Sequence, residues 1–258
     1  LQEIYSALLD HGLAVTFEDP HAFTDVNTTI ELRASGASDP DLIYDLIDFD
    51  ADGVLFGRAA MAAYTGGAYS ETAHSAECQW ILGFEGVAAA ADDAVTAQLC
   101  AMVLGGGMSS RLFQALREDR GLVYDTSAFH WAFVDSGLFA IHFATEEGSV
   151  EEAAGVVADE LAAAQGTVSQ DELDRARAQL RAGLLMSRES CAARMSAAAR
   201  HAMVFGRVVE KEERIAALEK VTPDDIHAFL ATLTASRPTV VSVGASADMT
   251  LGLIDGRF

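Results

Sequence analysis

The sequence predicts an α+β fold in which helices pack on a mostly antiparallel sheet. Residues 122–131 and 137–145 have the composition of strands, and only the short connection Val134–Gly137 separates them. A connection this short cannot hold the crossover helix that parallel strands need, so the two strands are expected to pair antiparallel. Helical patterns then occupy most of 150–234, before a last strand-like segment at 239–243. Strands and helices grouped separately in this way are typical of α+β domains.

The elements that precede this strand pair fit the same class. Residues 79–84 are continuously apolar, as in a buried strand, and Asp92 or Asp93 is placed to cap a helix after it. A glycine turn leads to a second helix, expected over 109–119. Gly121 follows this helix and suits the position just past a helix C-terminus, where glycine adopts a positive φ without strain.

The helical block begins at recognisable capping signals. Ser149-x-x-Glu152 and Ser169-x-x-Glu172 have the spacing of capping boxes, and each precedes an apolar stripe of helical period. Thr222-Pro223-Asp224-Asp225 starts a later helix with proline at its first position. Two further helices are expected over 189–205 and 210–219. Most of this half of the chain is therefore predicted to be helical.

The first 60 residues differ in composition from the rest. They hold 12 acidic and 2 basic residues, a net charge of −10. A strand is expected over 26–36, then a short helix from Pro40 to Ile47, and glycines make 50–68 loop-like. We therefore divide the chain into an acidic segment, 1–60, and a main domain, 61–258.

The formal charge of the chain is −22, from 39 acidic and 17 basic residues. This charge argues against nucleic acid and anionic membrane surfaces as partners, and it suits basic, extended peptides. An adaptation to solubility or salt explains it equally well. No stretch of about 18 apolar residues lacks charges, so no membrane span is predicted.

The cysteines and the start of the chain bear on its compartment. Cys78, Cys100 and Cys191 are odd in number and far apart, which is typical of reduced thiols. No signal peptide is visible, although the chain begins at Leu1 and a leader could be missing from this sequence. A bacterial cytoplasm is the favoured compartment, with the periplasm and the mitochondrial matrix as alternatives.

No metal or nucleotide motif is complete. His74-Ser75-Ala76-Glu77-Cys78 is one residue short of H-x-x-E-H, and it leads directly into a strand, which cannot bring positions i and i+4 together as a helix does. The three glycines Gly105, Gly106 and Gly107 follow a helix and precede no lysine, unlike a phosphate-binding loop. His142 is expected to be a hydrogen-bonded core residue, and helix capping is expected to account for the serines at 109 and 110.

Arg117 and Tyr124 are the remaining candidates. Both side chains can donate hydrogen bonds to a peptide carbonyl, and the turn at Gly121 could bring them together. From the residues alone, a structural arginine and a half-buried tyrosine remain the favoured interpretation.

Several motifs nevertheless resemble one family. They include Tyr64-Thr65-Gly66-Gly67, the run Leu82–Gly86, and above all the stretch Leu104–Tyr124, which reads Leu-Gly-Gly-Gly-Met-Ser-Ser-Arg-Leu-Phe before ending in Arg-Gly-Leu-Val-Tyr. Arg175–Leu180 and Phe205-Gly206-Arg207 add to them. From about Tyr64 onward the chain resembles the C-terminal domain of pitrilysin-type zinc peptidases, in the branch of mitochondrial processing peptidase. Residues 26–60 resemble, more loosely, the end of the preceding N-terminal domain.

The resemblance implies two similar α+β halves that face each other across a peptide chamber. In active members the N-terminal half carries H-x-x-E-H and the zinc, and the C-terminal half supplies an arginine and a tyrosine seven residues apart that hold the substrate backbone. That pair falls on Arg117 and Tyr124, and Gly105, Gly106 and Gly107 would shape the chamber wall. The chain has no H-x-x-E-H, so no zinc ligands are assigned to it and it is expected to be inactive alone.

Three functions remain open at this stage. The first is the substrate-binding portion of a zinc endopeptidase, completed by a zinc-bearing half or subunit. The second is a non-catalytic structural subunit, like the core proteins of a respiratory complex in the same family. The third is a peptide-binding module without an enzymatic partner. The retained Arg117 and Tyr124 favour the first.

Overall fold

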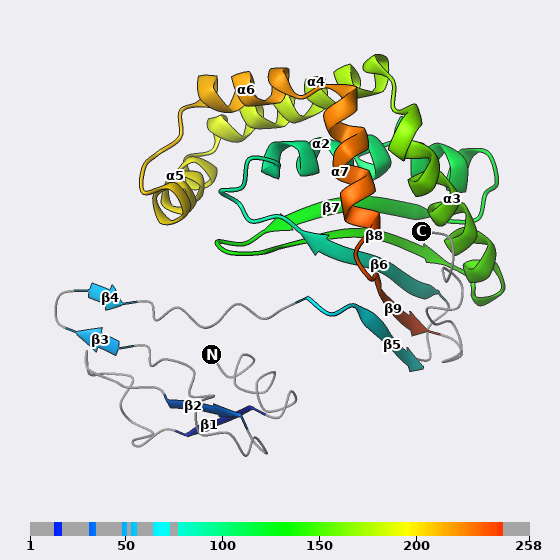
Figure 1. Cartoon of the computed structure of the whole chain (residues 1–258), viewed down its shortest axis with the longest axis horizontal. Coiled ribbons are helices and arrows are strands. Elements are labelled where there is room, and N and C mark those ends of the chain that lie inside the picture. Colours follow the sequence, from blue (N-terminus) through cyan, green and yellow to red (C-terminus); the bar gives the residue numbers. More distant parts are fainter. Residues whose placement is uncertain are drawn as a thin grey trace. The chain divides into compact units, whose positions relative to one another are not determined.

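The computed structural model describes residues 64–72 and 77–244, together with the backbone of four short strands nearer the N-terminus. The chain divides into two units, Leu1–Ala63 and Tyr64–Phe258. Figure 1 shows the elements of both, and each unit is described by itself.

The described residues of the first unit form two antiparallel strand pairs. β1 (Leu13–Thr16) pairs with β2 (Glu31–Ala34), and β3 (Asp48–Asp50) pairs with β4 (Gly53–Leu55). β2 lies inside the strand predicted over 26–36, whereas the helix predicted up to Ile47 lies outside the described residues. The prediction of a loop over 50–68 is wrong in part, because Asp50 belongs to β3, Gly53–Leu55 form β4, and a further strand begins at Gly67.

The second unit is built on a five-stranded sheet with the order β5-β9-β6-β8-β7. All neighbours in it are antiparallel except β5 and β9, so the predicted α+β class with a mostly antiparallel sheet is confirmed. The edge strand β5 was not predicted. The strands are β5 (Gly67–Thr72), β6 (Cys78–Gly86), β7 (Asp125–Ala132), β8 (Gly137–Thr145) and β9 (Thr239–Gly244).

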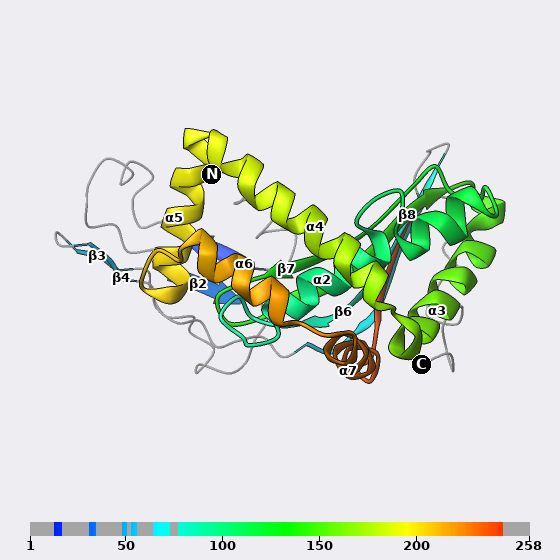
Figure 2. The same ribbon diagram turned by 90° about the horizontal axis from the view of Figure 1, so that it is seen from above.

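Helices cover one face of this sheet in two layers. α2, α3 and α7 lie against the strands, and α4 and α6 lie farther from the sheet, beyond α2 (Figures 1 and 2). α2 is largely apolar, with Gln98 as its exposed residue, because it is packed between the sheet and this outer layer. No helix of the described residues is long and apolar enough to cross a membrane. The helices are α2 (Ala94–Gly105), α3 (Val150–Thr167), α4 (Gln170–Met186), α5 (Cys191–Phe205), α6 (Lys211–Lys220) and α7 (Pro223–Thr234).

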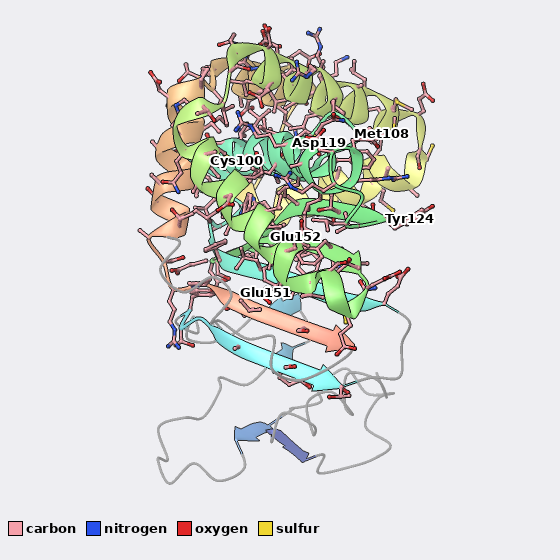
Figure 3. The ribbon with its side chains drawn as sticks, turned by 90° about the vertical axis from the view of Figure 1, so that its right-hand side faces the viewer. Cys100, Met108, Asp119, Tyr124, Glu151 and Glu152 are labelled. Atoms are coloured by element: carbon pink, nitrogen blue, oxygen red, sulfur yellow. The ribbon has the colours of Figure 1, made fainter. Side chains whose placement is uncertain are left out.

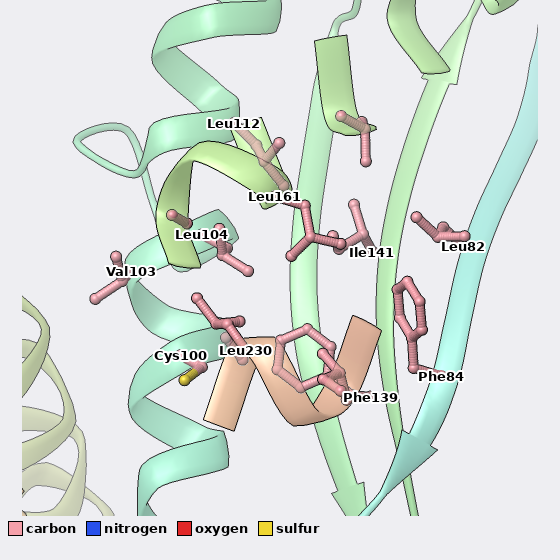
Figure 4. Packing of buried hydrophobic residues seen from close by; sticks show 14 of the residues in the cluster. Leu82, Phe84, Cys100, Val103, Leu104, Leu112, Phe139, Ile141, Leu161 and Leu230 are labelled. Atoms are coloured by element: carbon pink, nitrogen blue, oxygen red, sulfur yellow. The ribbon is translucent and has the colours of Figure 1, made fainter. Parts of the chain in front are cut away.

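The core lies between the sheet and the first helical layer (Figure 4). Phe139, Ile141 and Phe143 alternate along β8 and are fully buried, as their shared face predicted. Trp80 on β6 stacks on Phe143 with ring centroids 4.9 Å apart. Cys100 of α2 is also fully buried and behaves as a small core residue, and burial raises the pKa of its thiol.

Of the helix caps predicted at Asp92 or Asp93, Ser149, Ser169 and Thr222, two are formed. Asp93 is the N-cap residue of α2, but its side chain accepts no hydrogen bond from the helix, so that prediction is wrong. Ser169 and Glu172 form a complete capping box at the start of α4, and Thr222 and Asp225 form one at the start of α7. The box predicted at Ser149 is wrong. A 3₁₀ turn over Glu147–Ser149 precedes α3 and leaves Ser149 with φ −104° and ψ −5°, so its hydroxyl does not accept a hydrogen bond from the helix.

Candidate functional site

The glycine run joins α2 to the segment that carries Arg117. Gly105, the last residue of α2, lies directly on the backbone of β7, and a Cβ built there would be 2.2 Å from the amide nitrogen of Ala128. Only glycine permits this approach of helix to strand. The first glycine of the run is therefore required by packing within the domain.

The loop after Gly105 is tied to α4 by side chains. Gln179 donates from Nε2 to the Gly106 carbonyl at 2.9 Å. Arg111 forms a two-pronged ion pair with Glu172, at 2.6 Å from Nε to Oε1 and 3.1 Å from Nη2 to Oε2, and also donates to Thr167. These contacts hold the start of the Arg117 segment against the α3–α4 junction.

Glu172 titrates far below its ordinary range. Partial burial would raise the pKa of this carboxyl, but the Arg111 guanidinium and the amide and hydroxyl of Ser169 outweigh burial and lower the pKa from 4.5 to about 2. The carboxylate is therefore ionised at every pH at which the protein is expected to work.

Arg117 lies on a π-helical turn, Phe113–Glu118. A π-type hydrogen bond runs from the Asp119 amide to the Gln114 carbonyl at 2.9 Å, and beyond the turn the Leu122 amide donates to the Leu116 carbonyl at 2.8 Å. Gly121 closes the turn with φ +63°, as its position in the sequence predicted. Such π-turns occur frequently at functional sites, and this one leads almost directly into β7.

The turn brings Arg117 and Tyr124 together. The guanidinium carbon of Arg117 lies 5.1 Å from the centroid of the Tyr124 ring and 4.9 Å from that of Phe113, so the cation contacts both aromatic faces. Phe113 is buried, whereas the Tyr124 side chain is 77% exposed. Figure 3 shows Tyr124 at the margin of the molecule. Phe113 was not singled out in the sequence, although its i, i+4 spacing to Arg117 was a usable signal.

The Arg117 guanidinium has no hydrogen-bond or ion-pair partner among the described residues. Arg177 shows the contrast, because it donates to the carbonyls of Leu218 and Val221 and to the Asp174 carboxylate. The N–H donors of Arg111 are likewise used, in bonds to Glu172 and Thr167. Arg117 is thus held in place by ring contacts while its N–H donors remain available to a ligand.

Ser110, just before this turn, does not act as predicted. The Ser110 carbonyl accepts the Gln114 amide at 3.1 Å, so the residue does mark the helix start. Its hydroxyl, however, is buried and finds no partner among the described residues. Capping therefore does not explain Ser110, because the helix begins without a side-chain acceptor for its first amides.

The incomplete zinc motif is not assembled in the part of the chain that the structure describes. His74 lies outside the described residues, Glu77 is exposed, and Cys78 is buried as the first residue of β6. Within the described ranges, no three His, Cys, Asp or Glu side chains are grouped to hold a metal ion.

The described histidines have structural contacts. The ring of His142 bonds through Nε2 to Oε1 of Gln79 at 2.7 Å, but it lies half-buried on the sheet face away from the core, so its predicted place in the core is wrong. His130 contacts the Val87 carbonyl at 3.0 Å. Burial lowers the pKa of both imidazoles, which keeps them neutral near pH 7.

A shallow groove elsewhere on the molecule is lined by side chains of α4 and α6, among them Asp174, Arg177 and Glu219. Arg177 is occupied by structural hydrogen bonds there. The groove holds no cluster of reactive groups and is not a competing site.

Comparisons with known proteins bear on this arrangement. Residues 64–180, which contain the whole Gly105–Tyr124 run, match the family described as Peptidase M16 inactive domain. An uncharacterised zinc protease of Streptomyces coelicolor is 31% identical over 192 residues, which cover 74% of this chain and 41% of that protein. A second, from Rickettsia bellii, is 35% identical over 147 residues, covering 57% of this chain and 36% of that protein.

Residues 64–180 are thus similar to the inactive domain of M16 (pitrilysin-type) peptidases. The chain spans less than half the length of these curated relatives. Solved structures share the fold. The M16 inactive domain from Pseudomonas fluorescens superposes with a TM-score of 0.58 at 23% identity, over 74% of this chain and 47% of that one. A chain of complex III from Candida albicans gives 0.65 at 14% identity, over 88% and 51%.

Proposed function

We propose that this M16 domain is the substrate-binding half of a zinc endopeptidase, and that Arg117 and Tyr124 hold the backbone of a bound peptide. The single observation that carries the proposal is the Arg117 guanidinium, fixed against the Phe113 and Tyr124 rings with no partner of its own among the described residues. A cation held in this way has lost much of its side-chain freedom before it meets a ligand, which lowers the entropy cost of binding.

The two side chains suit an extended peptide. A guanidinium presents several donors in one plane, so it can bond to a substrate carbonyl while the Tyr124 hydroxyl donates to another. Ring contacts orient Arg117 without consuming its N–H groups, and the exposed hydroxyl of Tyr124 is within reach of solvent and ligand. In this proposal Gly105, Gly106 and Gly107 shape the wall of the peptide chamber.

Zinc would come from outside the described residues. It would be supplied by an H-x-x-E-H-bearing homologous half or subunit, where it would activate the attacking water. In this chain Arg117 and Tyr124 bind and orient the peptide only. The net charge of −22 favours basic, extended peptides. We place the chain in the branch of mitochondrial processing peptidase and its bacterial relatives, and in the cytoplasm of a bacterium.

The test combines the chain with the H-x-x-E-H half encoded in the same genome and measures cleavage of a basic, quenched-fluorescent peptide. Arg117→Ala is expected to lower kcat/KM about 10- to 100-fold, because a hydrogen bond from a charged donor contributes about 1.5–3 kcal/mol. Tyr124→Phe removes only the hydroxyl and is expected to lower kcat/KM about 2- to 10-fold. Arg175→Ala, at an exposed arginine of α4, is the matched control. Equal activity of all three variants and the wild type would show that the site is assigned wrongly.

A non-catalytic structural subunit is the second candidate. The likeness to a complex III chain supports this candidate only at the level of the fold. A purely structural role needs no exposed tyrosine over an unpartnered guanidinium, which is why we rank it second. Stable association with the zinc-bearing half, without any cleavage of basic peptides, would favour it.

A further inference from the structure

Phe113 is buried without being part of the core. Its side chain is only 7% exposed, yet it lies outside the cluster of buried apolar residues between the sheet and the helices. Its neighbours Leu112 and Leu116 both belong to that cluster, and Figure 4 shows Leu112 within it. Every other buried apolar side chain of the described ranges that is larger than alanine also belongs to it. Core packing therefore does not explain why a large aromatic residue stands at this position.

The Phe113 ring carries a cation over its face. The guanidinium carbon of Arg117 is 4.9 Å from the centroid of this ring and 5.1 Å from that of Tyr124. The face of an aromatic ring is electron-rich and attracts a cation, most strongly where water is excluded. Phe113 is buried, whereas Tyr124 is 77% exposed. The contact with Phe113 is therefore the stronger of the two attachments of Arg117.

The two rings also differ in their freedom to move. Phe113 is the first residue of the π-helical turn Phe113–Glu118, and burial holds its side chain in one arrangement. Tyr124 makes no side-chain hydrogen bond among the described residues, and Figure 3 shows it at the margin of the molecule. An exposed side chain of this kind changes rotamer within nanoseconds. Tyr124 can therefore leave Arg117 and turn to a ligand, whereas Phe113 stays in contact with Arg117.

We propose that Phe113 is a positioning residue, whose ring keeps the Arg117 guanidinium in place while Tyr124 turns its hydroxyl to the bound peptide. This inference rests on the proposed function for the identity of the ligand. Phe113 is too buried to contact the peptide itself, so it acts through Arg117. Without the Phe113 ring, the peptide would have to order the Arg117 side chain each time it binds, and the lost side-chain entropy would weaken binding.

Two other roles for Phe113 lead to different expectations. If the side chain only fills space beneath the turn, any apolar group of the same shape serves, whatever the electron density of its ring. If the peptide contacts Phe113 directly, the effect of changing the ring does not depend on Arg117. The positioning role requires both the electron-rich ring face and the cation over it.

The experiment replaces Phe113 by mono-, di- and trifluorophenylalanine. These residues nearly keep the shape of the ring, while fluorine withdraws electron density from its face. Cleavage of the basic peptide is measured with this chain and the H-x-x-E-H half from the same genome. We expect kcat/KM to fall with each added fluorine, to about a third to a tenth of the wild-type value in the trifluorinated variant, while Tm changes little. The matched control is the same series in the Arg117→Ala background, where the three variants should cleave equally.

A second measurement follows Arg117 in the full chain without the zinc-bearing half. NMR relaxation of the arginine Nε–H groups is expected to show an ordered Arg117, in contrast to Arg175, an exposed arginine of α4. Phe113→Leu keeps an apolar side chain but removes the ring. In this variant Arg117 should become nearly as mobile as Arg175.

The outcomes separate this inference from the proposed function. The positioning role is overturned if kcat/KM does not change with fluorination, or if Arg117 is as ordered in Phe113→Leu as in the wild type. A fluorine effect that persists in the Arg117→Ala background also overturns it, because the peptide would then contact Phe113 itself. The proposed function fails instead if Arg117→Ala cleaves like the wild type, and in that case the relaxation measurement still decides whether Phe113 holds Arg117.

Discussion

Replacing Gly105 by alanine tests how closely α2 is packed on the sheet. In a helix this substitution ordinarily stabilises a protein by about 1 kcal/mol, because glycine is the poorer helix former. Here the new Cβ would lie 2.2 Å from the Ala128 nitrogen and 2.7 Å from the Ser127 carbonyl carbon. Both are backbone atoms of β7 that cannot rotate away, so helix and strand must separate. Overpacking of this kind costs about 1–3 kcal/mol and sometimes more.

We take about 3 kcal/mol for the collision, because two backbone atoms are involved, and offset it by the helix preference. The net loss is about 2 kcal/mol, or about 4–8 °C in Tm for a domain of this size. Calorimetry of the chain measures it. Gly183→Ala is the matched control, since no atom lies within 4 Å of its Cβ position in α4, and it should raise Tm slightly. If Gly105→Ala melts at or above the wild-type temperature, the close approach to β7 is not real.

Two further predictions concern stability near the site. Gly121→Ala is expected to lower the free energy of unfolding by about 1–2 kcal/mol purely from backbone strain, because φ is +63° and nothing lies within 4 Å of the Cβ position. Gly121→Asn should lower it less. Equal losses for the two variants in urea titrations would contradict this explanation. The Glu172 carboxyl has a folded-state pKa below its unfolded value, so its contribution is present above about pH 4.5 and is lost as pH falls through about 2. Across that window stability should fall by roughly 2 kcal/mol, after allowance for solvent screening. Glu172→Gln should be less stable at pH 7 and should lack this part of the acid transition; an unchanged pH profile would refute the Arg111–Glu172 assignment.

The parts of the fold that could be predicted are those in which local pattern and burial agree. β6 and β8 read as strands because their inward residues, such as Trp80 and Phe139, are large and apolar and become fully buried. β5 could not be found in this way. It lies at the edge of the sheet, most of its side chains are exposed, and its one partner, β9, is distant in sequence. At Ser149 the prediction failed for a different reason. The sequence has the spacing of a capping box, but a 3₁₀ turn just before the helix prevents the box from forming.

Only those features of the candidate site whose residues lie close together in the sequence could be predicted. The seven-residue spacing of Arg117 and Tyr124 across a glycine turn indicated that the two could meet, and Phe113 could have been added from helical spacing. The hydrogen bonds and the ion pair that hold the segment before Arg117 in place leave no comparable pattern in the sequence. Gln179 contacts Gly106 across 73 positions, and Arg111 reaches Glu172 across 61. Pairs so far apart become neighbours only when α4 packs over α2, which a single sequence does not reveal.

The glycine run is weaker evidence for a ligand than its appearance suggests. Three successive glycines look like a loop built to approach a substrate, yet Gly105 is required by the contact with β7, and the Gly106 carbonyl is held by Gln179. Gly107 has φ +154° and faces the same glutamine, so internal packing accounts for it as well. Internal requirements do not account for Arg117 in this way, because the described residues satisfy none of its donors. The functional argument therefore depends on the arginine, and substitutions in the glycine run are expected to change stability and activity together, whereas Arg117→Ala should change activity with little effect on Tm.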